Sequence, residues 1–151
     1  MNLAHHIGLL HAAEADLAAA FRDVADAHPD EPDVRLDCQR LATWCDRHVA
    51  ELAPFAERYG EAGDDEPDRI RSAAFGGSRS GPLGLLRDLQ DLYLMASECD
   101  ITWTLVGQAA KGARDDDLLA AVERCEGETA TQQSWLRTRL KQAAPQALVV
   151  A

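Results

Sequence analysis

The sequence predicts an all-α protein, a bundle of four helices in one domain. Apolar residues recur at intervals of three and four in four stretches of about 25 residues each, which is helical spacing. Breaks that contain proline or glycine separate these stretches, at residues 27–33, 60–84 and 112–117. A chain of 151 residues has the size of one domain and can bury a core without disulfides. We therefore expect a single four-helix-bundle domain over residues 1–151.

The first helix is expected from residue 3 to residue 24. Its stripe of core positions consists of Leu3, Ile7, Leu10, Glu14, Leu17, Phe21 and Val24. Glu14 lies in the middle of this stripe. In an alternative interpretation, the core face is rotated toward Ala13 and Ala20 and leaves Glu14 on the rim. Two prolines and an Asp cap then lead into the second helix, and so short a link predicts antiparallel neighbours.

The second helix carries a histidine in its apolar stripe, from residue 34 to residue 55. The stripe consists of Val34, Cys38, Leu41, Cys45, His48, Leu52 and Phe55. His48 therefore points toward the core. A buried imidazole that lacks partners loses about 1–3 kcal/mol for each unpaired group. We expect a facing helix to supply a partner for it.

A long connection separates the second helix from the third. It spans about residues 60–84, begins at the helix terminator Gly60 and is rich in Gly, Pro, Ser, Asp and Arg. A crossover that returns along the bundle accounts for this length, and it requires the second and third helices to be parallel. The alternative is an insertion without regular structure.

The last two helices follow from near Pro82 and from the acidic cluster at residues 114–117. The third stripe consists of Leu85, Leu89, Leu92, Ala96, Cys99, Trp103, Val106 and Ala110, and Glu98 lies one residue off it. The fourth stripe consists of Leu119, Val122, Glu126, Thr129, Gln133, Leu136 and Leu140. Pro145 is expected to end the fourth helix. The apolar tail, residues 143–151, is expected to pack back onto the bundle or onto a second subunit of a homo-oligomer.

Charge and composition narrow the class of protein. The formal net charge of −11 disfavours binding to nucleic acid or to an anionic membrane surface. The start of the chain lacks the pattern of a signal peptide, and no run approaches the length of a membrane span, so we expect a cytoplasmic location. Cys38 and Cys45 lie about 10 Å apart by helical rise, too far for a disulfide. We expect buried, reduced thiols.

Four polar residues fall near the middle of their helices: Glu14, His48, Glu98 and Glu126. In an antiparallel bundle, such positions meet at one height whichever direction each helix runs. Three carboxylates and one imidazole suit a divalent transition metal, for example iron, zinc or manganese. Cys45-x-x-His48 alone is too sparse a pattern to indicate a zinc site.

This arrangement of helices and polar residues resembles the ferritin-like superfamily of four-helix bundles. The resemblance covers about residues 3–140 and implies two antiparallel helix pairs joined by a long crossover. In the di-iron members of that superfamily, the first and third helices each supply a Glu, and the second and fourth each supply Glu-x-x-His. The resemblance therefore implies metal-ligand roles for Glu14 and Glu98.

The second and fourth helices depart from the ferritin-like motif. Cysteine stands at the Glu position of Cys45-x-x-His48, and threonine stands at the His position of Glu126-x-x-Thr129. The resemblance thus implies a degenerate di-metal carboxylate site, which binds one transition metal or holds only a hydrogen-bonded polar cluster. The predicted metal ligands are Glu14, His48 and Glu126, joined by Cys45 or Glu98.

Three hypotheses for function follow from the sequence. The first is a ferritin-like, metal-binding and redox protein. The second is a metal-free helical bundle that serves as an assembly or protein-interaction module. The third is a bundle that holds an organic ligand among Trp44, Trp103 and Trp135. The sequence shows no nucleophile with an ordered base partner and no glycine-rich phosphate loop, so it assigns no reaction.

Overall fold

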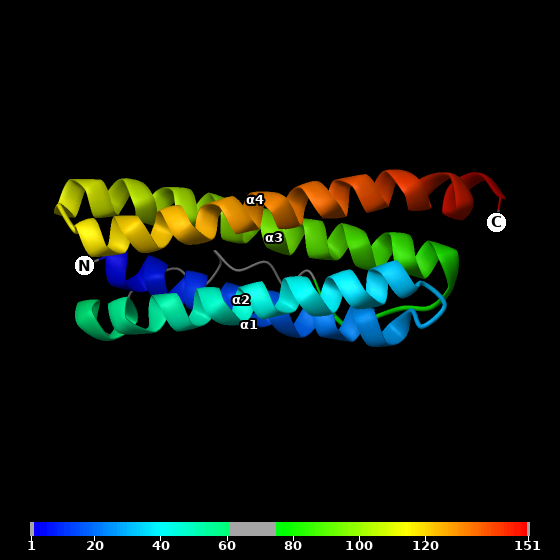
Figure 1. Cartoon of the computed structure of the whole chain (residues 1–151), viewed down its shortest axis with the longest axis horizontal. Coiled ribbons are helices and arrows are strands. Elements are labelled where there is room, and N and C mark those ends of the chain that lie inside the picture. The colour runs from blue at the N-terminus through cyan, green and yellow to red at the C-terminus, as the bar shows by residue number, and fades with distance from the viewer. Residues whose placement is uncertain (1, 61–74, 151) are drawn as a thin grey trace.

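The computed structural model describes residues 2–60 and 75–150, and these residues form helices and turns without strands (Figure 1). The elements are α1 (Asn2–Ala27), α2 (Pro32–Tyr59), α3 (Gly81–Ala113), α4 (Asp116–Pro145) and the short π-helix η1 (Gln146–Val150). The predicted all-α class is confirmed. No helix of the described residues is long and apolar enough to cross a membrane.

The four helices pack as two antiparallel pairs. α1 pairs with α2, and α3 pairs with α4; α1 and α3 join the two pairs, while α2 and α4 lie less closely together. Polar side chains fill the wider space between α2 and α4: Arg124 bonds to Glu51, and the Trp135 indole donates to Asp37 over 2.9 Å. Every residue of the predicted α2 stripe other than His48 is a buried apolar side chain or thiol.

Contacts at the two ends of the bundle fix the directions of the helices. The Arg58 guanidinium, near the end of α2, contacts Asp115 at the start of α4. The Arg139 guanidinium, late in α4, contacts Asp33 at the start of α2. His28, just after α1, lies 2.8 Å from Asp88 at the start of α3. α2 and α3 therefore begin at the same end and run in the same direction, as Figure 1 shows.

The parallel course of α2 and α3 places Gly60 and Gly84 at opposite ends of the bundle (Figure 1). This is the arrangement that the long connection led us to expect. Most of the predicted crossover falls on residues 61–74, which lie outside the described residues. A ferritin-like crossover therefore stays a prediction.

The turn between α1 and α2 differs from the prediction at its cap. Glu31, not an aspartate, occupies the N-cap position of α2, and its side chain makes no capping hydrogen bond. Instead its carboxylate accepts from Arg139 over 2.9 Å. The predicted Asp cap is therefore wrong, because the carboxylate at the cap position pairs with an arginine of α4 instead.

The turn between α3 and α4 is tight and acidic, as predicted. Arg114 takes the left-handed conformation with φ of 56°, and Asp115 caps α4 by accepting from the Leu118 N–H over 3.0 Å. α3 continues through Gly112, so this glycine does not form the turn. The Tyr59 hydroxyl also donates to Asp115, over 2.6 Å, which ties the end of α2 to this turn.

The sequence predicts that the apolar tail packs back onto the bundle or onto a second subunit. The tail continues the line of α4 as η1 and packs back only in part, because Ala147 is buried whereas Leu148, Val149 and Val150 are exposed.

All four cysteines are buried and unbridged. The prediction of buried thiols without disulfides is therefore confirmed.

Candidate functional site

His48 lies in the core at mid-height of the bundle, and both of its ring nitrogens face carboxylates. Nδ1 lies 3.1 Å from Oε1 of Glu14 on α1, and Nε2 lies 3.1 Å from Oε1 of Glu128 on α4. The His48 side chain is 1% exposed. The prediction that a facing helix meets this imidazole is confirmed, with two helices supplying partners.

Glu14 is completely buried, so the alternative that placed it on the rim is wrong. Its Oε1 atom accepts a second hydrogen bond from the Trp103 indole N–H on α3, over 2.8 Å. The Trp103 and His48 rings meet edge to face, with centroids 5.8 Å apart. Oε2 of Glu14 has no hydrogen-bond partner among residues 2–60 and 75–150. Glu14 thus connects α1 to both α2 and α3.

Glu128 carries the chain of contacts from His48 to the surface. Its side chain is 30% exposed, and its Oε2 atom accepts from Nη2 of Arg47 over 2.6 Å. The ionised forms of Glu14, His48, Glu128 and Arg47 carry two negative and two positive charges. The group is therefore neutral as a whole, which lowers the cost of placing ions in the core.

The surroundings of His48 favour its protonated form. Burial lowers its pKa, but the hydrogen bonds and negative charges of Glu14 and Glu128 outweigh burial and raise the pKa above its ordinary value. The protonated ring can donate from both nitrogens, whereas a neutral ring would turn one bare nitrogen toward a carboxylate. We name the group Arg47, Glu128, His48, Glu14 and Trp103 the histidine cluster.

Cys45, one turn before His48, is held as a thiol. Burial, then the charge of Glu14, raises its pKa well above the ordinary range of a cysteine. The Gln132 side-chain amide donates to the Cys45 sulfur over 3.3 Å and to the Leu41 carbonyl over 3.1 Å. A thiol of raised pKa is a weak nucleophile and a poor metal ligand, because both roles need the thiolate.

The remaining predicted ligands do not meet His48. Glu126 is half-buried and accepts from the Thr104 hydroxyl over 3.3 Å, and Glu98 is half-buried on α3. Thr129 is buried and donates to the Cys125 carbonyl. Two residues along a helix correspond to a rotation of about 200°, so Glu126 and Glu128 point to different sides of α4. The carboxylate bonded to His48 is that of Glu128, which the sequence analysis did not select.

A polar stripe on α4 could have revealed Glu128. The stripe consists of Glu128, Gln132, Trp135 and Arg139, at intervals of four, three and four. Each of these side chains bonds to a residue of α2. The predicted stripe of α4 consisted of the neighbouring positions, because helical periodicity is most visible in apolar residues. Polar periodicity was the overlooked signal.

A second buried histidine lies at the end of the bundle that holds the turn between α1 and α2. His28 Nε2 is 2.8 Å from Oδ2 of Asp88, which also accepts from the Arg79 backbone N–H over 2.9 Å. The Arg79 guanidinium bridges Asp88 and Asp91, at 2.9 Å from each. This group, too, was not selected from the sequence. It fastens the segment before α3 to the end of α1.

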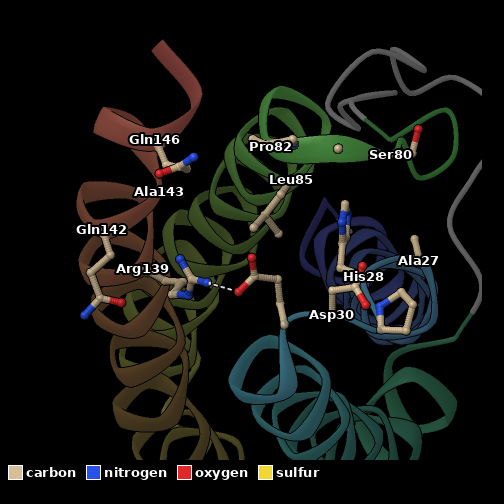
Figure 2. A pocket seen from close by; sticks show the side chains of 13 residues that line it. Ala27, His28, Asp30, Ser80, Pro82, Leu85, Arg139, Gln142, Ala143 and Gln146 are labelled. Atoms are coloured by element: carbon tan, nitrogen blue, oxygen red, sulfur yellow. Dashed lines mark hydrogen bonds and ion pairs between the residues drawn. The ribbon is translucent and has the colours of Figure 1, made fainter. Parts of the chain in front are cut away.

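His28 borders a pocket of about 500 Å³ at the same end of the bundle (Figure 2). Leu85 and Ala143 contribute apolar surface, and Arg139 lies against it. The Arg139 guanidinium is already bonded to Glu31 and Asp33, so it has no free charge for a ligand. Nothing in this pocket indicates a particular substrate.

The described residues contain no group of three or more His, Cys, Asp or Glu side chains arranged to hold a metal ion. The geometry of the histidine cluster explains this finding. Glu14 and Glu128 lie at different nitrogens of one ring, which point away from each other, so the two carboxylates and His48 cannot share one ion. The arrangement fits a hydrogen-bonded chain better than a coordination sphere.

Comparison of the chain with protein-family models, with curated proteins and with solved structures finds no match of any of the three kinds. The ferritin-like resemblance rests on the sequence pattern alone and stays a prediction.

Replacing Glu14 tests its place in the histidine cluster. Glu14→Gln leaves His48 with one carboxylate, and we expect a loss of about 3 kcal/mol in the free energy of unfolding, as for a broken buried ion pair. Glu126→Gln is the matched control. It should cost less than about 0.5 kcal/mol, because Glu126 is half-buried and a glutamine oxygen can still accept from Thr104. Urea denaturation measures both, and equal losses would contradict the assignment.

The raised pKa of His48 predicts how stability depends on pH. The folded-state pKa exceeds the unfolded value of 6.5, so the stabilisation is complete below about pH 6.5 and is lost as pH rises through the folded pKa. His48→Gln removes the titrating group. The stability advantage of the wild type over this variant should shrink as pH rises from about 6 to 9. Urea midpoints at each pH measure it, and an advantage that grows with pH would refute the sign.

Proposed function

We propose that this chain is a metal-free helical bundle that serves as a self-assembly module, forming a homo-oligomer through the outer face of α3. The observation that supports this proposal is the distribution of exposed apolar residues. Among the described residues, the large apolar side chains that are exposed are Leu36, Leu83, Leu94, Ile101, Leu105, Leu148, Val149 and Val150. All except Leu36 belong to α3 or to η1.

The central part of this surface is a stripe along α3 formed by Leu94, Ile101 and Leu105. These side chains are 56%, 55% and 50% exposed, and their spacing of seven and four places them on one side of the helix. The other sides of α3 pack against α1 and α4. A helix in a monomer normally presents polar residues to water, so an exposed apolar stripe is typical of an interaction surface.

This face of α3 carries a single exposed charged residue. That residue is Arg87, seven positions before Leu94, and the half-buried Glu98 also lies on this side, four positions after Leu94. The chain as a whole has a net charge of −11, which opposes association through most of its surface. A two-fold axis midway between residues 94 and 101 would place Leu94 of each copy against Ile101 of the partner subunit.

The histidine cluster then has a structural role in this proposal. Both ring nitrogens of His48 contact carboxylates of the cluster, and the half-buried Glu128 connects the cluster to solvent. His48 does not line the pocket that His28 borders, and its side chain is 1% exposed. This supports a module that acts through its surface rather than through chemistry in its core.

The ferritin-like hypothesis, with one iron, zinc or manganese ion bound by Glu14, His48 and Glu126 and joined by Cys45 or Glu98, is the rival proposal. The unpartnered Oε2 atom of Glu14 is the observation that favours it. Binding would require His48 Nδ1 to give up its contact with Glu14 and Cys45 to lose its proton. Elemental analysis of protein purified without chelator or histidine tag separates the two proposals: one metal ion per chain would support the rival.

Charge placed on the α3 stripe should disrupt assembly. We expect wild-type protein at micromolar concentration to sediment as a dimer or larger species. Ile101→Asp should raise the dissociation constant at least about tenfold, since burying such a side chain contributes about 1.5–3 kcal/mol. Leu36→Asp, on an exposed leucine of α2, is the control and should change nothing. Analytical ultracentrifugation measures all three, and a monomeric wild type would overturn the proposal.

A further inference from the structure

We propose that a groove between α3 and α4 binds an acidic amphipathic helix of another protein. This groove is separate from the Leu94, Ile101 and Leu105 stripe, and its occupant is a different molecule from the second copy proposed above. The inference therefore goes beyond self-association and does not depend on it.

The groove has an apolar floor and a basic rim. Leu86 of α3, Leu140 and Ala144 of α4 and Leu148 of η1 form the floor, and Arg137 and Lys141 of α4 form the rim. The space measures about 400 Å³, which admits a few apolar side chains of a partner. Leu148 is 65% exposed at its edge, so a partner that filled the groove would cover it.

Within the described part of the chain, neither cation of the rim forms an ion pair, whereas most of the other arginines do. Six arginines form ion pairs, with N···O distances of at most 4 Å, to acidic side chains on other elements or turns. They are Arg22, Arg47, Arg58, Arg79, Arg124 and Arg139. Arg137 instead donates to the Tyr93 hydroxyl over 2.6 Å and stacks on the Tyr93 ring, and Lys141 has no ion pair with a described residue. No acidic residue lines the groove. The rim is therefore complementary to an anionic partner.

The spacing of the groove residues matches a helix. Leu140, Ala144 and Leu148 follow one another at intervals of four, so they lie in a row along one side of α4 and η1. Arg137 and Lys141 are also four residues apart, about 6 Å along the axis. A helix that lies in the groove can present leucines to this floor and glutamates, three or four residues apart, to the two cations.

A helix fits this surface better than an anionic membrane does. The net charge of −11 would repel an anionic lipid surface over the rest of the molecule, whereas a single helix meets only the groove. The shape of the site is a channel between two helices, which suits side chains projecting from a rod. A lipid surface is therefore an outcome that the experiment must exclude.

The test uses a synthetic 16-residue peptide, with leucines at helical spacing and glutamate and alanine elsewhere, and the same peptide with lysine in place of each glutamate. Binding to the full chain is measured by fluorescence anisotropy. We expect the glutamate peptide to bind and the lysine peptide not to bind, with affinity falling as salt rises. Equal binding of both peptides, or of neither, would overturn the proposal.

Matched variants locate the peptide on the protein. Arg137→Glu combined with Lys141→Glu, and separately Leu148→Asp, should each weaken binding about tenfold or more. Arg35→Glu and Leu36→Asp make the same chemical changes on exposed positions of α2 and should leave binding unchanged. An equal loss in the α2 variants would overturn the proposed location. Circular dichroism confirms that each variant is folded.

Two further measurements distinguish helix binding in the groove from self-association and from membrane binding. Ile101→Asp protein should bind the glutamate peptide as the wild type does, so a failure of self-association and a failure of the groove are distinguishable. Vesicles of three parts phosphatidylcholine to one part phosphatidylglycerol should not bind the chain. The proposal would be overturned if the wild type bound vesicles but neither peptide, and if the double variant Arg137→Glu, Lys141→Glu no longer bound vesicles. The groove would then be a membrane-binding surface.

Discussion

The imidazole of His48, held between the carboxylates of Glu14 and Glu128, is the interaction on which the middle of this bundle depends. It joins α2 to α1 through one nitrogen and to α4 through the other, and Trp103 adds α3 through Glu14. All four helices therefore meet in one polar layer. Removing any one partner would leave a charged or polar group without compensation in the core, which costs several kcal/mol. Such a layer fixes the register of the helices more strictly than apolar packing alone.

The hydrogen bonds and ion pairs of His48 also limit the chemistry that this layer can perform. A ring whose two nitrogens both face carboxylates is committed to donating hydrogen bonds, and Cys45 beside it is a thiol of raised pKa. A metal would have to break contacts that already neutralise the layer. For this reason we propose that the chain acts through its surface, where α3 and η1 expose apolar side chains.

Helical periodicity alone predicted much of the fold and part of the site. It predicted the all-α class, the complete buried stripe of α2 and the inward direction of Glu14 and His48, because each of these follows from one helix face. It failed where the outcome depended on two helices at once. Glu128 reaches His48 because α4 turns a polar side toward α2, and Glu31 binds Arg139 rather than capping its own helix. Pairings of this kind depend on the rotation of each helix about its axis, which a single stripe does not determine.

The state of the His48 ring decides between a hydrogen-bonded layer and a metal centre. The most direct measurement is the ¹⁵N chemical shift of both His48 ring nitrogens, recorded at about pH 6, below the raised pKa, with and without an equimolar amount of Zn²⁺. We predict that both nitrogens carry protons and that their shifts do not change on addition of the metal. A ring nitrogen that lacks a proton, and whose shift moves when Zn²⁺ is added, would contradict this account.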